Sequence, residues 1–328
     1  MLELLVVLVA SFLVTFFVTP QLIRKISRAR IRIFGRDMNK PDHPDVPEMG
    51  GLGVVAGFVA GVLLAVALST FHITGISLNL TYLLAGLSTV LIMALVGIFD
   101  DLLVMRQSVK AALPLLASLP LVAIKLGDTR MTFPFLGEIN FGLLFPLFLI
   151  PLAITGASNA TNMLAGFNGL EAGLGLVMTT TVGIAALALG RTEAVIISFA
   201  MVGALIAFLR YNWYPARILI GDVGTLTIGT VVAVAVIVGN MEKVGIILIL
   251  PFFAELYLKA RSRFKAQSWC EVHGHKLYCQ KKKEIYGLGR LVMYLSNGIT
   301  EEKLVLSLIG LEAVFAVFAL AALAYGIL

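Results

Sequence analysis

Residues 97–110 read GIFDDLLVMRQSVK and close a long apolar run. The run delivers two adjacent carboxylates, Asp100 and Asp101, to its end, and two cations, Arg106 and Lys110, precede the next apolar run. One ionised carboxylate at the centre of a membrane helix costs about 2.5–3.5 kcal/mol on insertion scales, so an adjacent pair needs cations, a metal ion or water close by. The pair therefore marks either the edge of a membrane or a polar site at that edge.

The composition indicates an integral membrane protein. Hydrophobic residues make up 59% of the 328 residues, only 13% are charged, and the mean hydropathy is +0.98, whereas a soluble domain has about a quarter charged residues. We expect one polytopic domain over residues 1–328. The net charge of +6 does not indicate a nucleic-acid partner, because the cations lie between apolar runs, where they orient membrane proteins. The first apolar run has no basic segment before it, so no cleavable signal peptide is expected.

The apolar runs predict an all-α fold. A helix needs about 20 apolar residues to cross a bilayer, and by that measure ten transmembrane helices are expected, at residues 2–22, 50–71, 80–99, 111–126, 141–157, 170–189, 193–209, 221–239, 244–261 and 304–327. Ten crossings place both termini on one side. The connections at 23–49 and 259–303 are rich in Lys and Arg, and the opposite side has only Lys125, Arg130, Arg191 and Lys243. The positive-inside rule therefore predicts cytoplasmic basic loops and outside termini in a cell membrane.

Five polar clusters lie on the predicted cytoplasmic connections. They are GRDMNKPDHPDVPEMGG (35–51), FDDLLVMRQSVK (99–110), GASNATNMLAGFNGLEAG (156–173), RYNWYPARILIGDVG (210–224) and CEVHGHKLYC (270–279). A transporter or channel, the low-ranked alternative, would place ionisable groups at mid-membrane and carry inverted repeats. Neither is evident in the sequence, so a catalytic face on the cytoplasmic surface explains the one-sided clusters better.

The cluster at 156–173 carries Asn159, Asn162 and Asn168 among several glycines, and we expect it to be a loop. Asparagine supplies both a donor and an acceptor, and glycine lets a ligand approach the backbone closely. A simple polar turn would also use Asn and Gly. Three asparagines with so many glycines are more than a turn needs, which favours a binding loop.

Asp222, in the segment LIGDVG, stands where an apolar run begins again. A carboxylate near a helix N-terminus gains about 0.3–1 kcal/mol from the helix dipole, and this alone could explain Asp222. Together with Asp100, Asp101 and Asn162, however, it completes the set of oxygen ligands that Mg²⁺ prefers, with substrate phosphates and water in the remaining positions.

The segment CEVHGHKLYC leaves three interpretations open. Two Cys and two His are suitable zinc ligands, although the spacing of Cys270, His273, His275 and Cys279 fits no common zinc pattern. The segment could equally be a solvated basic loop. The third interpretation is phosphate or sugar binding by the two histidines and Lys276.

In sequence order, FDD with Lys110, NATNMLAGFNGLEAG, NWYPARILIGD and the histidine loop resemble the polyprenyl-phosphate N-acetylhexosamine-1-phosphate transferase superfamily over essentially the whole chain. The asparagine motif, with GRDMNK…VPE and NWYP, looks closest to the archaeal and eukaryotic branch that makes dolichol-linked GlcNAc. The resemblance implies a Mg²⁺-dependent enzyme, with Mn²⁺ as a substitute, that transfers GlcNAc-1-phosphate from UDP-GlcNAc to a polyprenyl (dolichyl) phosphate and releases UMP. A related enzyme using another UDP-sugar, such as UDP-MurNAc-pentapeptide, is the alternative. Homodimers are common in the family.

The resemblance also implies residue roles. Asp100 would act on the lipid phosphate, Asp101 would hold the catalytic network together, and Lys110 would bind the phosphates. Asn162 and Asp222 would hold Mg²⁺. The remaining assignments are contacts to the nucleotide (Asp37, Met38, Glu48, Gly166 and Asn168) and to the pyrophosphate and sugar (His273 and His275).

Overall fold

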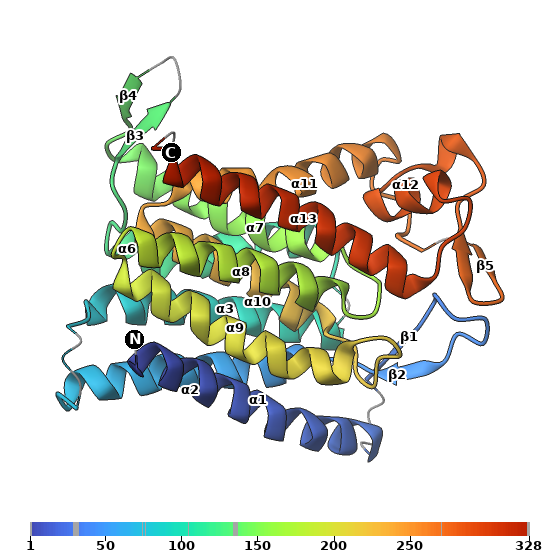
Figure 1. Cartoon of the computed structure of the whole chain (residues 1–328), viewed down its shortest axis with the longest axis horizontal. Helices are drawn as coiled ribbons and strands as arrows, with labels where there is room; N and C mark the ends of the chain where they lie inside the picture. The colour runs from blue at the N-terminus through green and yellow to red at the C-terminus, as the bar shows by residue number, and fades with distance from the viewer. Residues whose placement is uncertain are drawn as a thin grey trace.

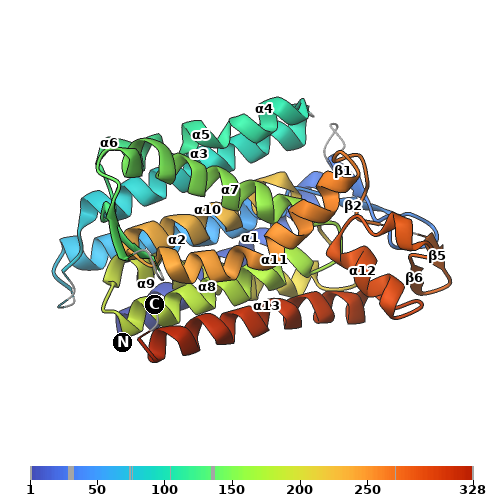
Figure 2. The same cartoon turned by 90° about the horizontal axis from the view of Figure 1, so that it is seen from above.

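The computed structural model describes residues 2–28, 33–73, 75, 77–103, 105–133, 137–269 and 271–326. Its long helices run side by side in one bundle (Figures 1 and 2). By length and composition seven of them can cross a membrane: α1 (Leu2–Arg28), α2 (Gly51–Thr70), α3 (Leu80–Leu103), α8 (Leu170–Ala188), α9 (Thr192–Asn212), α10 (Gly221–Gly239) and α13 (Glu301–Ala324). A multi-pass helical membrane protein is thus confirmed, with seven of the ten expected spans.

The other three expected spans are less regular. The segment 111–126 is divided between α4 (Gln107–Ala112), α5 (Pro114–Ala117) and α6 (Leu119–Ala123), where Pro114 and Pro120 stand in the first turns of α5 and α6. The segment 141–157 is a π-helical turn, η1 (Phe145–Leu149), that leads into α7 (Ile150–Met163). Helix α11 (Glu242–Arg261) is long but more polar. Proline removes a backbone donor and clashes with the preceding turn, which explains the broken segments.

Three two-stranded antiparallel hairpins, absent from the all-α expectation, occupy the connections: β1 (Phe34–Arg36) with β2 (Asp45–Pro47), β3 (Arg130–Phe133) with β4 (Gly137–Asn140), and β5 (Glu271–His273) with β6 (Lys276–Tyr278). The first and third lie at one end of the bundle with the short 3-10 helix η2 (Lys282–Glu284) and helix α12 (Leu288–Leu295) nearby in the chain. Both chain ends and β3–β4 lie at the opposite end (Figure 1). The two ends of the bundle therefore differ, and the polar clusters gather at the first.

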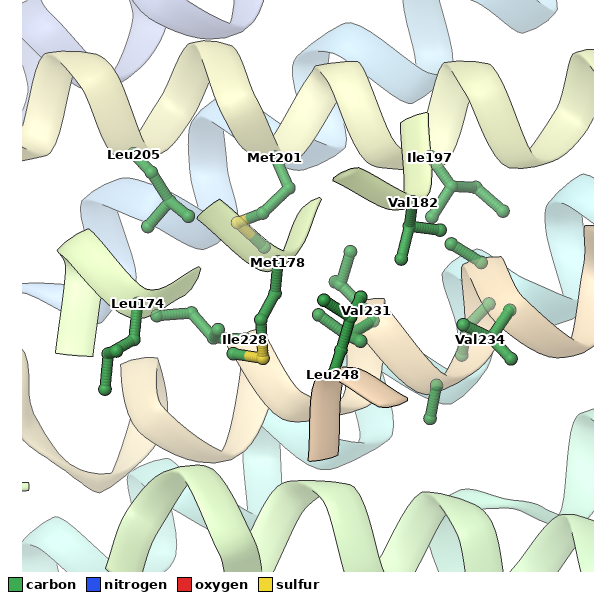
Figure 3. Close-up of a cluster of buried hydrophobic side chains, with 14 of the residues drawn as sticks. Leu174, Met178, Val182, Ile197, Met201, Leu205, Ile228, Val231, Val234 and Leu248 are labelled. Atoms are coloured by element: carbon green, nitrogen blue, oxygen red, sulfur yellow. The ribbon is translucent and has the colours of Figure 1, made fainter. Parts of the chain in front are cut away.

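Helix α10 is the centre of the bundle. Every residue from Val223 to Gly239 is buried, and the helix packs against α2, α3, α7, α8 and α9. Figure 3 shows Ile228, Val231 and Val234 of α10 among apolar side chains of α8, α9 and α11. A helix that is apolar on all sides can be covered by other helices or by lipid, and in this bundle α10 is covered by its neighbours. Asp222 in its first turn is consequently held near the middle of the bundle's polar end.

Glycines bring two helices to backbone contact with the start of α10. A Cβ built on Gly97 of α3 would lie 2.4 Å from the Cα atom of Val223, and one on Gly51 of α2 would lie 2.3 Å from the backbone nitrogen of Gly224. Small residues at such crossings let helices approach closely. The contact at Gly97 places the next turn of α3, which carries Asp100 and Asp101, against the N-terminus of α10.

Replacing Gly97 with alanine should therefore disturb both packing and activity. The added methyl group meets backbone rather than a flexible side chain, so we expect the free energy of unfolding to fall by about 1–3 kcal/mol. Turnover should fall too, because α3 must move away from α10. Gly310→Ala in α13 is the matched control, since its Cβ would meet nothing within 4 Å. Thermal unfolding in detergent checks both, and equal stability of the two variants would contradict the packing argument.

Candidate active site

The first part of the site is a partly buried triad of charges formed by Asp100, Lys110 and Asp222, the last with a side chain that is 26% exposed. The Lys110 ammonium lies 2.5 Å from Asp100 Oδ2 and 2.7 Å from Asp222 Oδ2. The Asp100 side chain is 4% exposed and that of Lys110 15%. The other carboxylate oxygen of Asp100 accepts a hydrogen bond from the backbone N–H of Met105, 3.0 Å away. Lys110, on α4, thus pairs with a carboxylate from the end of the preceding helix, α3.

Asp101 has a different task from its neighbour. Its two carboxylate oxygens accept hydrogen bonds from the backbone N–H groups of Asp222 at 2.7 Å and Val223 at 3.1 Å. These are among the first N–H groups of α10, which have no partner within the helix, and the helix dipole favours a negative charge there. Asp101 therefore fixes the start of α10 and so sets where the Asp222 side chain begins.

Glu48 approaches this triad from the connection that follows β2. Burial raises the pKa of its carboxyl group above the usual range, and the nearby carboxylate of Asp222 raises it further, while the Lys110 ammonium opposes both. The structure thus places Glu48, expected at the nucleotide, within electrostatic reach of the catalytic charges.

The second part of the site joins the β1–β2 connection to the loop between α7 and α8. The Asn168 side-chain amide donates to Asp37 Oδ2 at 3.0 Å, and the Asn39 amide donates to the carbonyl of Gly166 at 2.7 Å. Lys40 pairs with Asp37 at 2.8 Å. The residues expected to meet the nucleotide, Asp37, Gly166 and Asn168, are therefore brought together although more than a hundred residues separate them in the chain.

Gly166 and Gly169 give this loop its shape. Their φ angles are +112° and +82°, in the region that other residues rarely adopt. A side chain on Gly169 would also collide with Trp213, since its Cβ would lie 2.8 Å from that ring. The glycines are thus required by the turn as well as by any ligand.

Two asparagines of the expected loop are helical instead. Helix α7 continues to Met163, so Asn159 and Asn162 stand on its last turns, and the loop itself spans 164–169. The Asn159 amide is used within the fold, on the carbonyls of Thr155 at 2.9 Å and Ala111 at 3.4 Å. Asn162 lies on the part of α7 that packs against α10, since the neighbouring Thr161 hydroxyl donates to the carbonyl of Thr225 at 2.8 Å.

The histidine hairpin does not join either cluster. His273 and His275 are exposed on β5 and its turn, and the His273 ring lies 3.3 Å from Glu271 and edge-on to Tyr278. Cys279 is buried whereas the histidines are exposed, Cys270 lies outside the described residues, and the part of the chain that the structure describes contains no group of three metal-ligating His, Cys, Asp or Glu side chains. The hairpin nevertheless stands at the same end of the bundle as β1–β2 (Figure 1).

Three residues that organise the site went unassigned in the sequence. Glu171 Oε1 accepts from the N–H of Gly166 at 2.7 Å, and Glu301 Oε1 accepts from the N–H of Asn168, also at 2.7 Å. Lys259 of α11 contacts the carbonyl of Met163, at the end of α7, and pairs with Glu255 at 3.4 Å. Each begins or ends an apolar run, where charged residues ordinarily mark helix ends. The sequence therefore offered no signal that separates them from such residues.

The triad has the donor set for a divalent cation. Two carboxylate oxygens, from Asp100 and Asp222, converge on one cation, the Lys110 ammonium, at 2.5 and 2.7 Å. Mg²⁺ is usually bound by one or two carboxylates, with substrate phosphates and water completing its shell. The residues present thus fit Mg²⁺ shared with a phosphorylated substrate better than a metal held by protein ligands alone.

Fold and site together are those of a multi-pass helical bundle with a cluster of charges at one end, which suits the demands of phosphoryl transfer for charge neutralisation and positioning. The chain belongs to glycosyl transferase family 4, whose model matches residues 83–240. The matched region contains the whole Asp100–Lys110–Asp222 triad and the loop at 164–169. The superfamily expected from the motifs is thereby confirmed.

Relatives narrow the comparison. The chain is 37% identical over 321 residues to a Saccharolobus solfataricus protein provisionally named UDP-N-acetylglucosamine–dolichyl-phosphate N-acetylglucosaminephosphotransferase, covering 97% of this chain and 96% of the relative. The Dictyostelium discoideum enzyme of that name is 29% identical over 280 residues, 73% of this chain and 67% of its own. A Bacillus subtilis protein provisionally named undecaprenyl-phosphate N-acetylglucosaminyl 1-phosphate transferase is 29% identical over 247 residues, 74% of this chain and 65% of its own.

Proposed function

We propose that the protein transfers GlcNAc-1-phosphate from UDP-GlcNAc to a dolichyl or similar polyprenyl phosphate, releasing UMP and forming a GlcNAc-pyrophosphoryl lipid. The observation that carries the proposal is the partly buried triad at the start of the central helix, in a chain 37% identical over 97% of its length to a relative with that name. A soluble nucleotide sugar and a lipid phosphate can meet only at a membrane surface, and the polar end of this bundle provides such a place.

The triad supplies the chemistry. Asp100 acts on the acceptor phosphate and removes its remaining proton, while Lys110 neutralises charge on the phosphates. The acceptor phosphate is already an anion and attacks directly, so no covalent intermediate is needed. Asp101 keeps Asp222 in place through the first N–H groups of α10. A phosphosugar adduct trapped on Asp100 would overturn the direct attack.

Mg²⁺, or Mn²⁺ in its place, would be held by Asp222 and Asn162. When bound, the ion would neutralise the charge that develops on the pyrophosphate. The Asp222 oxygen that pairs with the Lys110 ammonium at 2.7 Å supports its part in this placement, since a carboxylate oxygen that meets one cation also suits a divalent one.

The joined loops would hold the nucleotide. Gly166 and Asn168 would meet the uracil, with the backbone at Asp37 and Met38, and the Glu48 carboxyl group would complete the site. His273 and His275, exposed on their hairpin at the same end of the bundle, would cover the pyrophosphate and sugar. The contacts between the two loops support the roles of Asp37, Gly166 and Asn168.

The polar end would face the cytoplasm, with ten crossings and both termini outside. Two observations support this orientation. The described parts of the basic connections, 23–28, 33–49, 259–269 and 271–303, lie at the polar end, away from the termini, and excess Lys and Arg mark the cytoplasmic side.

The reaction can be tested directly. Protein purified in detergent is given UDP-GlcNAc, a polyprenyl phosphate and Mg²⁺, and release of UMP is followed with and without the lipid. We expect UMP only when lipid and divalent cation are both present. Turnover with UDP-MurNAc-pentapeptide but not with UDP-GlcNAc would change the donor assigned to the enzyme, in line with the 28% identity to a phospho-N-acetylmuramoyl-pentapeptide-transferase of Clostridium perfringens. No turnover with any donor by a folded sample would refute the proposal.

A further inference from the structure

Glu301, at the start of α13, connects three segments that are remote in the chain. Its carboxylate oxygen Oε1 accepts from the backbone N–H of Asn168 at 2.7 Å and from the Asn39 side chain at 3.3 Å. Asn39 in turn donates to the Gly166 carbonyl at 2.7 Å. One carboxylate thus ties α13 to both the β1–β2 connection and the 164–169 loop.

The carboxylate is part of a buried hydrogen-bond network. Glu301 is 3% exposed, Asp37 and Asn168 are each 4% exposed, and Asn39 is 8% exposed. Burying a charged group costs free energy unless partners compensate it, and here the partners of Oε1 are the backbone N–H of Asn168 and the side-chain amide of Asn39. On its opposite side the same loop is held by Glu171, which accepts from the Gly166 N–H at 2.7 Å. Two carboxylates therefore fix adjacent parts of one loop.

We infer that Glu301 is a positioning residue for the nucleotide, acting through Asn39 and Asn168 rather than by touching the substrate. The inference rests on the proposed function, which places the uracil against Gly166, Asn168 and the backbone at Asp37. A loop with two glycines at positive φ has little stiffness of its own. Hydrogen bonds from outside the loop therefore hold its backbone in one conformation. Such precision matters because a misplacement of about 1 Å weakens binding and catalysis.

The position of Glu301 predicts different effects on the binding of the two substrates. Its hydrogen bonds run to the loops of the second cluster, and in the part of the chain that the structure describes it forms no hydrogen bond or ion pair with Asp100, Lys110 or Asp222. Loss of the carboxylate should therefore affect the donor nucleotide far more than the lipid acceptor. If Glu301 only supported the fold, its loss would instead lower the stability of the protein and weaken the binding of both substrates together.

The test uses full-length protein in detergent with Mg²⁺ and three variants, Glu301→Ala, Glu301→Gln and Glu302→Gln. UMP affinity is measured by calorimetry, and KM is measured separately for UDP-GlcNAc and polyprenyl phosphate. Glu301→Ala should weaken UMP binding and raise the donor KM by at least about 10-fold, the loss expected for a buried hydrogen bond to a charged group. Its acceptor KM should stay within about 2-fold, as should all values for the exposed neighbour in Glu302→Gln.

Glu301→Gln keeps an oxygen that can accept from the Asn168 N–H, so it should restore part of the UMP affinity and separate hydrogen bonding from folding. The inference would be overturned if both Glu301 variants bound UMP as tightly as wild type, or if the acceptor KM rose as much as the donor KM. Turnover by the wild-type protein would uphold the proposed function in either case. Failure of the wild-type protein to bind UMP and to turn over UDP-GlcNAc would overturn both.

Discussion

Asp100→Asn should lower turnover by about 10²- to 10⁴-fold, the usual contribution of a positioned general base. Asparagine has nearly the same shape, and its side-chain oxygen can still accept the N–H of Met105, 3.0 Å away in the native protein. Lys110 keeps Asp222 as a partner at 2.7 Å. The variant should therefore fold, bind UMP as wild type does, and fail at the chemical step.

The measurement is lipid-dependent UMP release at saturating substrates, with UMP affinity determined on the same samples. Asp42→Asn, an exposed carboxylate in the β1–β2 connection, is the matched control and should keep wild-type turnover. Asp100→Asn with most of its activity would remove Asp100 from the catalytic role. A variant that loses UMP binding as well as turnover would assign Asp100 to the nucleotide instead.

Much of the triad could be predicted because its members carry strong local signals. Adjacent carboxylates at the end of an apolar run, a lysine ten residues after Asp100, and a carboxylate opening another run are all visible in the sequence. Their distances are not. The sequence gives no rule for which apolar helices are neighbours, since every face of α10 is apolar and would suit many partners. The choice is made by backbone contacts at Gly51 and Gly97, which composition does not reveal.

Helix limits were predicted less well, for physical reasons that differ from place to place. The asparagine loop was expected to begin near residue 156, yet α7 runs to Met163. Asn is a turn residue because its side chain competes for backbone groups, but Asn159 here bonds the Thr155 carbonyl one turn earlier and stays helical. Glu301 was missed because a carboxylate in a first helical turn is explained by the helix dipole alone. Its contact to Asn168, 133 residues away, exists only in the folded chain.

Lys110→Met should have the second large effect, on stability as well as activity. The lysine is the only cation within 4 Å of Asp100 and Asp222 among the described residues. Breaking a buried ion pair by removing one partner costs about 3–5 kcal/mol, because the remaining charges are left uncompensated. We expect a marked fall in the free energy of unfolding when divalent cations are chelated, together with loss of turnover. Lys303→Met, at an exposed position in the first turn of α13, is the control and should change neither.

Adding a divalent cation back to the chelated proteins tests whether the triad is only an ion-pair network or also binds a metal. If the Asp222 oxygen that pairs with Lys110 also serves Mg²⁺, the ion should stabilise Lys110→Met more than wild type, since binding to the folded state alone raises stability by mass action. Thermal unfolding of both proteins across a Mg²⁺ titration measures this, without reference to activity. Equal shifts in the two proteins would mean that the ion binds elsewhere, and the triad would then be an ion-pair network rather than a metal site. A larger shift in the variant would mean that the lysine and the metal compete for the Asp222 carboxylate, as expected if Asp222 holds the ion.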